Sequence, residues 1–373
     1  ATDRGFMAKA IELARSGWYT TMPNPRVGCV IVDVNGHIVG KGWHEKAGEP
    51  HAEVHALRMA GMKAKGATAY VTLEPCSHFG RTPPCAEALK AAGVARVVAA
   101  IQDANPAVSG KGMALLQAAG IETLSGVLEE EARVLNEGFF KRMSTGMPLV
   151  RAKLAMSLDG RTAMASGESQ WITGPMARSE VQKLRAQSCA IITGVGSILL
   201  DNSSLTVRPD ELGLADAEAI CQRQPLRVVL DSTLRTPVNA RVISGPGHCL
   251  IVTTSQCCPE KKALLEQAGA EVLVLDNDIT AGRVSLPALL AELGRRECNE
   301  VLLETGAQLA GSMIAENLID ELMVFMAPVL MGSEARPLLD LPLHLMSEKT
   351  ELVINDIRAI GNDWKITARP IPE

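Results

Sequence analysis

The chain has 373 residues, of which 47% are hydrophobic and 21% charged, which is enough for two hydrophobic cores. A formal net charge of −5 and an aromatic content of 3% argue against a general attraction for nucleic acid and against a stacking platform for single strands. No run of about 18 apolar residues predicts a membrane-spanning helix, and nine cysteines without regular spacing fit a reducing cytoplasm better than a disulfide framework.

The first 143 residues alternate short apolar strands with amphipathic helices. The pattern predicts helices at 5–17, 52–61, 84–92, 111–119 and 129–143, and strands at 27–33, 37–43, 69–73, 94–101 and near 121. This alternation is typical of an α/β sheet with helices on both faces. Residues 144–148 break the pattern, so we predict a first domain at 1–146 and a second at 147–373.

A new series of strands opens the second domain. Residues 149–157 alternate apolar side chains with Lys153 and its neighbours on the other face, which predicts a strand. Apolar strands at 190–192 and 301–304 each lead into a glycine-containing turn. The polar stretch 208–225 predicts a long loop.

His51, Cys76 and Cys85 have the residue types of a catalytic zinc site. A structural zinc normally takes four protein ligands, so three leave one position for water, whose pKa zinc lowers from about 15.7 to about 7. Glu53 lies two residues after His51, where it can move that water's protons. His51 and Cys85 both precede helical patterns, and the positive end of a helix dipole favours the thiolate that binds metal.

Other interpretations of these residues are weaker. His51 and His55 are four residues apart, as in a zincin, but that motif requires glutamate directly after the first histidine, where the chain has Ala52. His55 is therefore predicted to be a packed or supporting residue. The other cysteines are predicted to be small buried residues (Cys29, Cys189, Cys221, Cys249 and Cys298) or loop residues (Cys257 and Cys258).

The spacing of the two cysteine ligands narrows the choice of deaminase. Eight residues separate Cys76 from Cys85, and the stretch P-C-S-H-F-G-R-T-P-P-C resembles the diaminohydroxyphosphoribosylaminopyrimidine deaminases of riboflavin biosynthesis. The upstream segments P-N-P-R-V-G, G-W-H and G-E-P-H-A-E extend the resemblance. It implies a cytidine-deaminase-like three-layer α/β/α domain with one zinc ion per chain. It also implies that the substrate is bound at Asn24, His44, Arg81, Asp103 and Asn105, with Ala104 replacing a proline usual in the family.

The second domain resembles the reductase half of the same bifunctional family. The matching segments are K-L-A-M-S-L-D-G-R-T-A from Lys153, G-E-S-Q-W-I-T from Gly167, T-G-V-G-S from Thr193 and L-E-T-G-A-Q-L-A-G-S from Leu303. They imply a dihydrofolate-reductase-like α/β fold that uses NADPH. The resemblance places substrate contacts at Ser169, Arg185, Leu205, Arg208 and Glu304, and cofactor contacts at Ala155, Trp171, Ser197, Asp201, Ser232, Gly306, Ala307, Gln308, Leu309, Ala310, Gly311 and Ser312.

The residue chemistry of the second domain can be interpreted beside this resemblance. A strand that feeds a glycine turn and a helix offers free N–H groups to a pyrophosphate, and Gly306 and Gly311 would permit close approach. Lys153 is a candidate proton donor to the sugar oxygen, oriented by Glu304. Judged alone, Arg185 would be a solvated surface charge and Trp171 a core residue.

The resemblance, which spans nearly the whole chain, implies two reactions. The first is hydrolytic deamination of 2,5-diamino-6-(5-phosphoribosylamino)pyrimidin-4(3H)-one, and the second is reduction of the ribosyl group of 5-amino-6-(5-phosphoribosylamino)uracil to ribityl. A cytoplasmic homo-oligomer, dimer or tetramer, without nucleic-acid or membrane partners is also implied. Two alternatives are a nucleotide or tRNA-base deaminase, and a reductase with a non-catalytic zinc scaffold domain.

Overall fold

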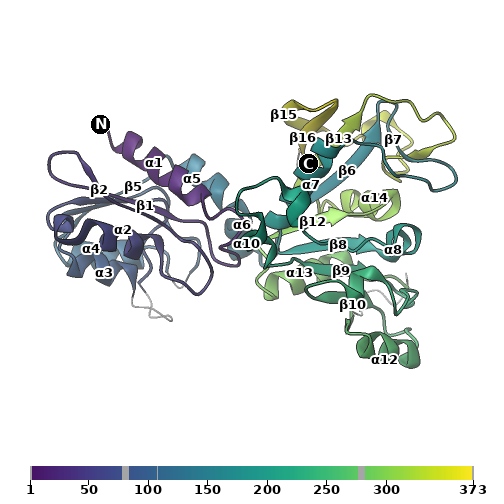
Figure 1. Cartoon of the computed structure of the whole chain (residues 1–373), viewed down its shortest axis with the longest axis horizontal. Helices are drawn as coiled ribbons and strands as arrows, with labels where there is room; N and C mark the ends of the chain where they lie inside the picture. Colours follow the sequence, from purple (N-terminus) through teal and green to yellow (C-terminus); the bar gives the residue numbers. More distant parts are fainter. Residues whose placement is uncertain (1, 78–83, 107, 276–281, 372–373) are drawn as a thin grey trace. The chain divides into compact units, whose positions relative to one another are not determined.

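The chain folds into two α/β units, residues 1–147 and 148–373 (Figure 1). The computed structural model describes residues 2–77, 84–106, 108–275 and 282–371. Across these residues, no helix combines the length and the apolar character needed to cross a membrane.

The N-terminal unit is built on a five-stranded sheet with the order β2-β1-β3-β4-β5. The first pairings are antiparallel, whereas β3, β4 and β5 run parallel. The strands are β1 (Gly28–Val32), β2 (Ile38–Trp43), β3 (Thr68–Val71), β4 (Arg96–Ala99) and β5 (Glu122–Ser125). The helices are α1 (Asp3–Arg15), α2 (Ala52–Ala60), the short 3-10 helix η1 (Gly61–Ala64), α3 (Cys85–Ala91), α4 (Lys111–Ala118), α5 (Glu129–Leu135) and α6 (Glu137–Thr145).

Helices cover both faces of this sheet. In β1, Cys29 and Ile31 pack with residues of α2, α3 and α4, whereas Val30 and Val32 pack with residues of α1 and α5. Because successive side chains of a strand point to opposite faces, a strand buried on both sides must be apolar throughout. The layers are therefore helix, sheet and helix, as predicted.

One predicted helix is interrupted. The pattern at 129–143 predicts a single helix, but the structure breaks it at Asn136 between α5 and α6. The side chain of Asn136 explains the break, because its Oδ1 accepts from the backbone N–H of Arg26 at 2.7 Å and its Nδ2 donates to the Arg26 carbonyl at 2.8 Å. This pairing ties the 23–27 loop, which contains Asn24, to the helical layer.

The C-terminal unit contains a nine-stranded sheet with the order β11-β10-β9-β8-β12-β6-β13-β16-β15. All neighbouring strands pair in parallel except β16, which is antiparallel to both of its neighbours, β13 and β15. They are β6 (Leu149–Ser157), β8 (Ala190–Gly194), β9 (Leu226–Leu230), β10 (Cys249–Thr253), β11 (Glu271–Val274), β12 (Glu300–Glu304), β13 (Glu321–Ala327), β15 (Leu352–Ile360) and β16 (Asp363–Pro370). Strands β7 (Arg161–Ala163) and β14 (Arg336–Pro337) form a separate antiparallel pair.

The helices of this unit pack on the parallel strands. Residues of α7 join those of β8, β12 and β13 in one core cluster, and residues of α8, α11 and α12 join those of β9, β10 and β11 in another. They are α7 (Pro175–Gln187), α8 (Val195–Asp201), α9 (Pro209–Leu212), α10 (Ala217–Cys221), α11 (Arg241–Ser244), α12 (Pro259–Gln267), α13 (Leu286–Arg295), α14 (Ala307–Ala315) and the 3-10 helix η2 (Met346–Glu348).

The polar stretch 208–225 is not the long loop that the sequence predicts. It contains the short helices α9 and α10, whose apolar residues Leu212 and Ile220 are buried. Pro209 occupies the first position of α9, where its missing N–H costs nothing. Two or three buried apolar side chains in an otherwise polar segment are too few to show a helical period.

We predict that Asn136→Ala will destabilise the N-terminal unit, because it leaves two buried backbone groups of Arg26 without partners. We expect a loss of about 1–3 kcal/mol in the free energy of unfolding, measured by urea denaturation. Asn35→Ala, at an exposed turn, is the matched control and should change it by less than about 0.5 kcal/mol. Equal effects from the two variants would contradict the structural role given to Asn136.

Candidate active sites

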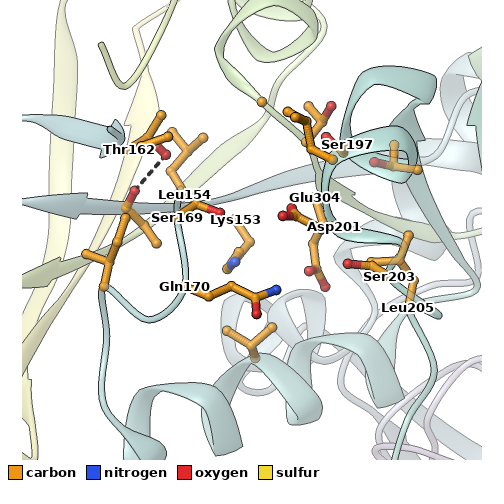
Figure 2. A pocket seen from close by; sticks show the side chains of 18 of the residues that line it. Lys153, Leu154, Thr162, Ser169, Gln170, Ser197, Asp201, Ser203, Leu205 and Glu304 are labelled. Atoms are coloured by element: carbon orange, nitrogen blue, oxygen red, sulfur yellow. Dashed lines mark hydrogen bonds between the residues drawn. The ribbon is translucent and has the colours of Figure 1, made fainter. Parts of the chain in front are cut away.

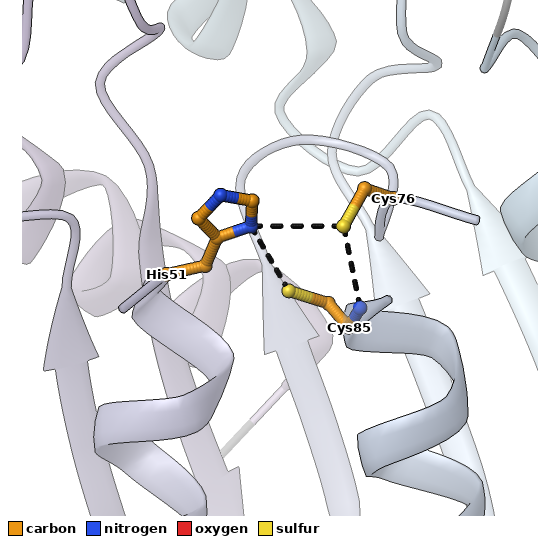
Figure 3. Close-up of side chains that lie close together, drawn as sticks. All are labelled: His51, Cys76 and Cys85. Carbon is orange, nitrogen blue, oxygen red and sulfur yellow. Dashed lines mark hydrogen bonds between the residues drawn. The ribbon is translucent and has the colours of Figure 1, made fainter. Parts of the chain in front are cut away.

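The three predicted zinc ligands come together in the N-terminal unit (Figure 3). His51 stands at the N-cap of α2, Cys85 is the first residue of α3, and Cys76 lies on the loop after β3. Their ligand atoms all lie within 4.8 Å of one another. The Nδ1 atom of His51 is 3.1 Å from Cys85 Sγ and 3.6 Å from Cys76 Sγ.

These three atoms fit a zinc ion. Tetrahedral zinc with bonds of about 2.3 Å to sulfur and about 2.0 Å to nitrogen places N and S atoms about 3.5 Å apart, close to the distances found. The backbone N–H of Cys85 donates to Cys76 Sγ at 3.2 Å. Hydrogen bonding from Cys85 is the largest of the effects that lower the pKa of Cys76 to about 4, which favours the thiolate form that binds metal.

Glu53 lies beside this cluster in the first turn of α2. Its side chain is buried, and burial raises the pKa of its carboxyl group, against the opposing effect of His51. A carboxyl group with a raised pKa exchanges protons near neutral pH more readily than an exposed one.

His44 and Asn24, both predicted substrate contacts, are hydrogen-bonded to each other. His44 Nδ1 donates to the Pro50 carbonyl at 3.2 Å, which leaves Nε2 to accept from Asn24 Nδ2 at 3.1 Å. Burial lowers the pKa of His44, so the neutral ring is favoured. The His44 ring also meets that of His51 edge-on at a centroid distance of 5.4 Å. The structure therefore brings Asn24 and His44 to the zinc-ligand cluster.

The other predicted deaminase contacts differ in how they are placed. Asp103 is buried, and one oxygen of its carboxylate accepts from the backbone N–H of Asn105 at 2.8 Å. Arg81 lies outside the described residues. Sequence reasoning missed Glu74, a buried carboxylate two residues before Cys76 that accepts four backbone N–H groups. The only signal for it was an acidic residue at the end of an apolar strand.

A cavity of about 310 Å³ lies at the carboxyl ends of β6, β8 and β12 in the C-terminal unit (Figure 2). In a parallel sheet this edge is where ligands bind. Lys153, Gln170 and Glu304 point into the same space. The predicted residues that line the cavity are Lys153, Ala155, Ser169, Trp171, Arg185, Ser197, Asp201, Leu205, Arg208, Glu304, Gly306 and Ala307; Ser232, Gln308, Leu309, Ala310, Gly311 and Ser312 do not line it.

Glu304 pairs with Arg185 through two hydrogen bonds. Both carboxylate oxygens accept from the Arg185 guanidinium, at 2.6 and 2.9 Å. The role of Glu304 in orienting Lys153, its neighbour on the adjacent strand, stays a prediction, because each carboxylate oxygen keeps a further lone pair. Arg185 is only 13% exposed, so the expectation of a solvated surface charge is wrong.

Lys153 also lines the cavity, and its side chain carries an ionisable ammonium group. Burial lowers the pKa of its ammonium group, and the nearby Glu304 carboxylate opposes that effect without reversing it. Burial also raises the pKa of Asp201, which lies on the same cavity wall. Shifts of this kind cluster at functional sites.

Of the two glycines predicted to let a ligand approach, Gly306 lies in the turn between β12 and α14, whereas Gly311 lies within α14. Gly306 is the N-cap of α14 without a side-chain cap, and a Cβ there would meet nothing within 4 Å. Gly311 does not offer the predicted approach to a ligand, because a Cβ there would lie 2.0 Å from the Asp340 carbonyl oxygen. Position 311 therefore requires glycine because α14 packs closely against the backbone of Asp340. The Thr305 hydroxyl accepts from Gly194 N–H at 3.2 Å and joins the two predicted cofactor turns.

Trp171 and Ser232 are placed differently from what their residue types suggest. Trp171 is 70% exposed, with the Arg178 guanidinium 4.5 Å from its ring centroid, so the core interpretation is wrong. Ser232 follows β9, and its carbonyl accepts from the hydroxyls of Thr253 and Thr254. Ser169 reaches the cavity from the loop after β7, whereas Leu205 and Arg208 reach it from the loop between α8 and α9, and Arg208 pairs with Glu211 at 2.8 Å.

Comparisons with known proteins match both units. Residues 1–101 match the family described as the cytidine and deoxycytidylate deaminase zinc-binding region, and residues 148–366 match the RibD C-terminal domain. The riboflavin biosynthesis protein RibD of Escherichia coli (strain K12) is 51% identical over 366 residues, 97% of each chain. The chain belongs to the RibD family. The RibD protein of Haemophilus influenzae is also similar, at 48% identity over 99% of this chain and 97% of its own.

Solved structures match over the same length. Acinetobacter baumannii RibD, form 1, has 45% identity and a TM-score of 0.91, with 99% of each chain covered. A Thermotoga maritima protein, described as a diaminohydroxyphosphoribosylaminopyrimidine deaminase/5-amino-6-(5-phosphoribosylamino)uracil reductase, has 31% identity and a TM-score of 0.84, again over 99% of each. The predicted fold is confirmed, with a cytidine-deaminase-like unit followed by a dihydrofolate-reductase-like one. The chain is a bifunctional riboflavin biosynthesis enzyme with a zinc-binding deaminase domain and a reductase domain.

The buried ammonium group of Lys153 predicts a pH-dependent stability difference. Because its pKa is lowered on folding, the charged lysine destabilises the fold at pH values below that lowered pKa, and the penalty vanishes above the unfolded value of about 10.4. We expect Lys153→Met to raise the melting temperature near neutral pH and the gain to shrink as the pH rises toward about 10.4. Calorimetry across that range measures it, with the surface variant Lys262→Met as control; a gain that grows with pH would contradict it.

Proposed function

We propose that the N-terminal domain deaminates 2,5-diamino-6-(5-phosphoribosylamino)pyrimidin-4(3H)-one. We propose further that the C-terminal domain then reduces the ribosyl group of 5-amino-6-(5-phosphoribosylamino)uracil to ribityl with NADPH. The observation that supports this most is the presence on one chain of the three-ligand cluster and of the cavity around Lys153. A nucleotide or tRNA-base deaminase would leave the cavity unexplained, and a reductase with a non-catalytic zinc scaffold domain would leave the buried Glu53 beside the three ligands unexplained. The name of the Thermotoga maritima relative describes the same pair of reactions.

In the deaminase, His51, Cys76 and Cys85 would hold one zinc ion per chain, which activates water for attack on the amino-bearing ring carbon. Glu53 would take a proton from the water and deliver protons to the ring nitrogen and the departing ammonia. Its burial next to His51 supports this role. The neutral His44 ring would hold Asn24 through the hydrogen bond from Asn24 Nδ2 to His44 Nε2. The Oδ1 atom of the Asn24 amide would then face the pyrimidine.

In the reductase, NADPH supplies the hydride, and the chain positions both reactants. The uncapped N–H groups at the start of α14 would bind a cofactor phosphate, and Ala155, Trp171, Ser197 and Asp201, which line the same cavity, would contact the rest of the cofactor. Lys153 would donate a proton to the sugar oxygen, a step that its lowered pKa makes easier. Arg185 and Arg208 would bind the substrate, including its phosphate group. The two hydrogen bonds to Glu304 fix the position of the Arg185 guanidinium.

We expect two single substitutions to separate the two activities. Glu53→Gln should lower deamination by about 10²- to 10⁴-fold while zinc content and reduction remain, because it removes only the proton carrier. Lys153→Met should do the reverse, abolishing reduction while ammonia release continues. Ammonia release, NADPH oxidation and metal analysis on the same samples measure all three quantities. A Glu53→Gln enzyme that still releases ammonia at the wild-type rate would remove the deaminase assignment.

We also propose that the enzyme is a cytoplasmic homo-oligomer, a dimer or tetramer. The edge strand β15 supports this, because the apolar side chains of Leu352, Val353, Ile354 and Ile357 are each between 44% and 56% exposed. An exposed apolar edge strand in a single chain would promote aggregation unless it were covered.

We expect Ile354→Glu combined with Ile357→Glu to reduce the mass measured by sedimentation to that of a smaller species, because buried charges would oppose association. Leu264→Glu is the control, since Leu264 on α12 is 53% exposed but lies away from β15 in the sequence and in the sheet order. If the double variant and the control sediment like the wild type, β15 is not the contact.

A further inference from the structure

Glu74 occupies the junction between two loops of the deaminase domain. It lies between the end of β3 and Cys76, and its carboxylate reaches the segment that contains Asp103 and Asn105. We propose that Glu74 is a positioning residue for deamination, which holds the Asp103–Asn105 loop in place beside the loop of the metal ligand Cys76. This inference rests on the proposed deaminase function.

The contacts of the Glu74 carboxylate are complete and all made with backbone. Its Oε2 accepts from the N–H groups of Asp103 at 3.1 Å and Gly110 at 2.9 Å, and its Oε1 from those of Gly112 at 3.0 Å and Met113 at 3.2 Å. The side chain is 3% exposed. In the part of the chain that the structure describes, no lysine or arginine pairs with it, so these four donors are its compensation for burial.

The backbone on either side of Glu74 is also held. Its own N–H donates to the Ile101 carbonyl at 2.9 Å, which extends the parallel pairing of β3 with β4 beyond Val71 and Ala99. A Cβ at Gly112 would lie 1.9 Å from the Pro75 carbonyl oxygen. The start of α4 therefore packs directly against the residue that precedes Cys76. A shift of the Asp103–Asn105 loop would break the hydrogen bond from the Asp103 N–H to Glu74, a residue whose backbone these contacts hold in place.

A carboxylate is the only side chain of this size that satisfies the four donors. An ionised carboxylate has acceptors on both oxygens and no donor, whereas an amide carries two N–H donors on one side. Glutamine at position 74 has the same shape, but in either orientation its NH₂ group would face two backbone N–H groups. The substitution Glu74→Gln therefore tests the hydrogen bonds with little change in packing volume.

We expect Glu74→Gln in the full chain to raise the KM of deamination by about 10-fold or more, with kcat and zinc content close to wild type. The reductase activity of the same chain should stay unchanged and serves as an internal control. Hydrogen exchange at the amides of Asp103, Gly110, Gly112 and Met113 should become faster. The matched control is Glu87→Gln on α3, whose half-exposed carboxylate pairs with Lys90 at 3.4 Å and lies two residues after Cys85; it should leave KM unchanged.

Two results would overturn the proposal. If zinc content and kcat fall together while KM is constant, Glu74 only stabilises the domain. If KM and the exchange rates match the wild type, the loop does not depend on Glu74. Glu74→Asp keeps both acceptor oxygens and should recover part of the lost KM; a value no better than that of Glu74→Gln would also count against the proposal. A wild-type chain that releases no ammonia would instead refute the proposed function, and the exchange measurement would still test the positioning role.

Discussion

The convergence of two helix starts and one strand end on a single point is the constraint on which the deaminase half depends. His51 and Cys85 stand where α2 and α3 begin, Cys76 follows β3, and their three ligand atoms lie within 4.8 Å. This is possible because α2 and α3 pack on the same face of the sheet and begin at the same edge. The N–H group of Cys85 at the start of α3 donates to Cys76 Sγ and favours the thiolate form of Cys76 at the point where a cation would bind.

The reductase half uses the same arrangement of parallel strands with a different chemistry at their ends. There the edge of the sheet holds a cavity with one buried ion pair, Glu304 with Arg185, and one lysine beside it. Glu304 hydrogen-bonds to the Arg185 guanidinium, and its charge acts on Lys153 through space. Burying the two charges of this ion pair costs desolvation free energy. A pair in the wall of a cavity is nevertheless expected where the fixed charges serve binding rather than stability.

The reductase half shows why single residue types are poor guides to environment. Trp171 is exposed although tryptophan is usually buried, and Arg185 is nearly covered although arginine is usually exposed. Each departure lies in the wall of the same cavity. Several residues with unusual burial or exposure are expected to lie together where the residue type is selected for binding rather than for stability.

The sequence alone determined the family and the order of its two domains, and it indicated His51, Cys76 and Cys85 as candidate zinc ligands with Glu53 beside them, because these features depend on residue types at fixed spacings. It could not reveal contacts between segments distant along the chain. The pairing of Asn136 with Arg26, of Glu74 with four N–H groups and of Gly311 with Asp340 all join residues at least 29 positions apart. Only the tertiary structure decided them, because hydrogen bonding and close packing depend on which elements the fold places side by side, and local periodicity does not encode that choice.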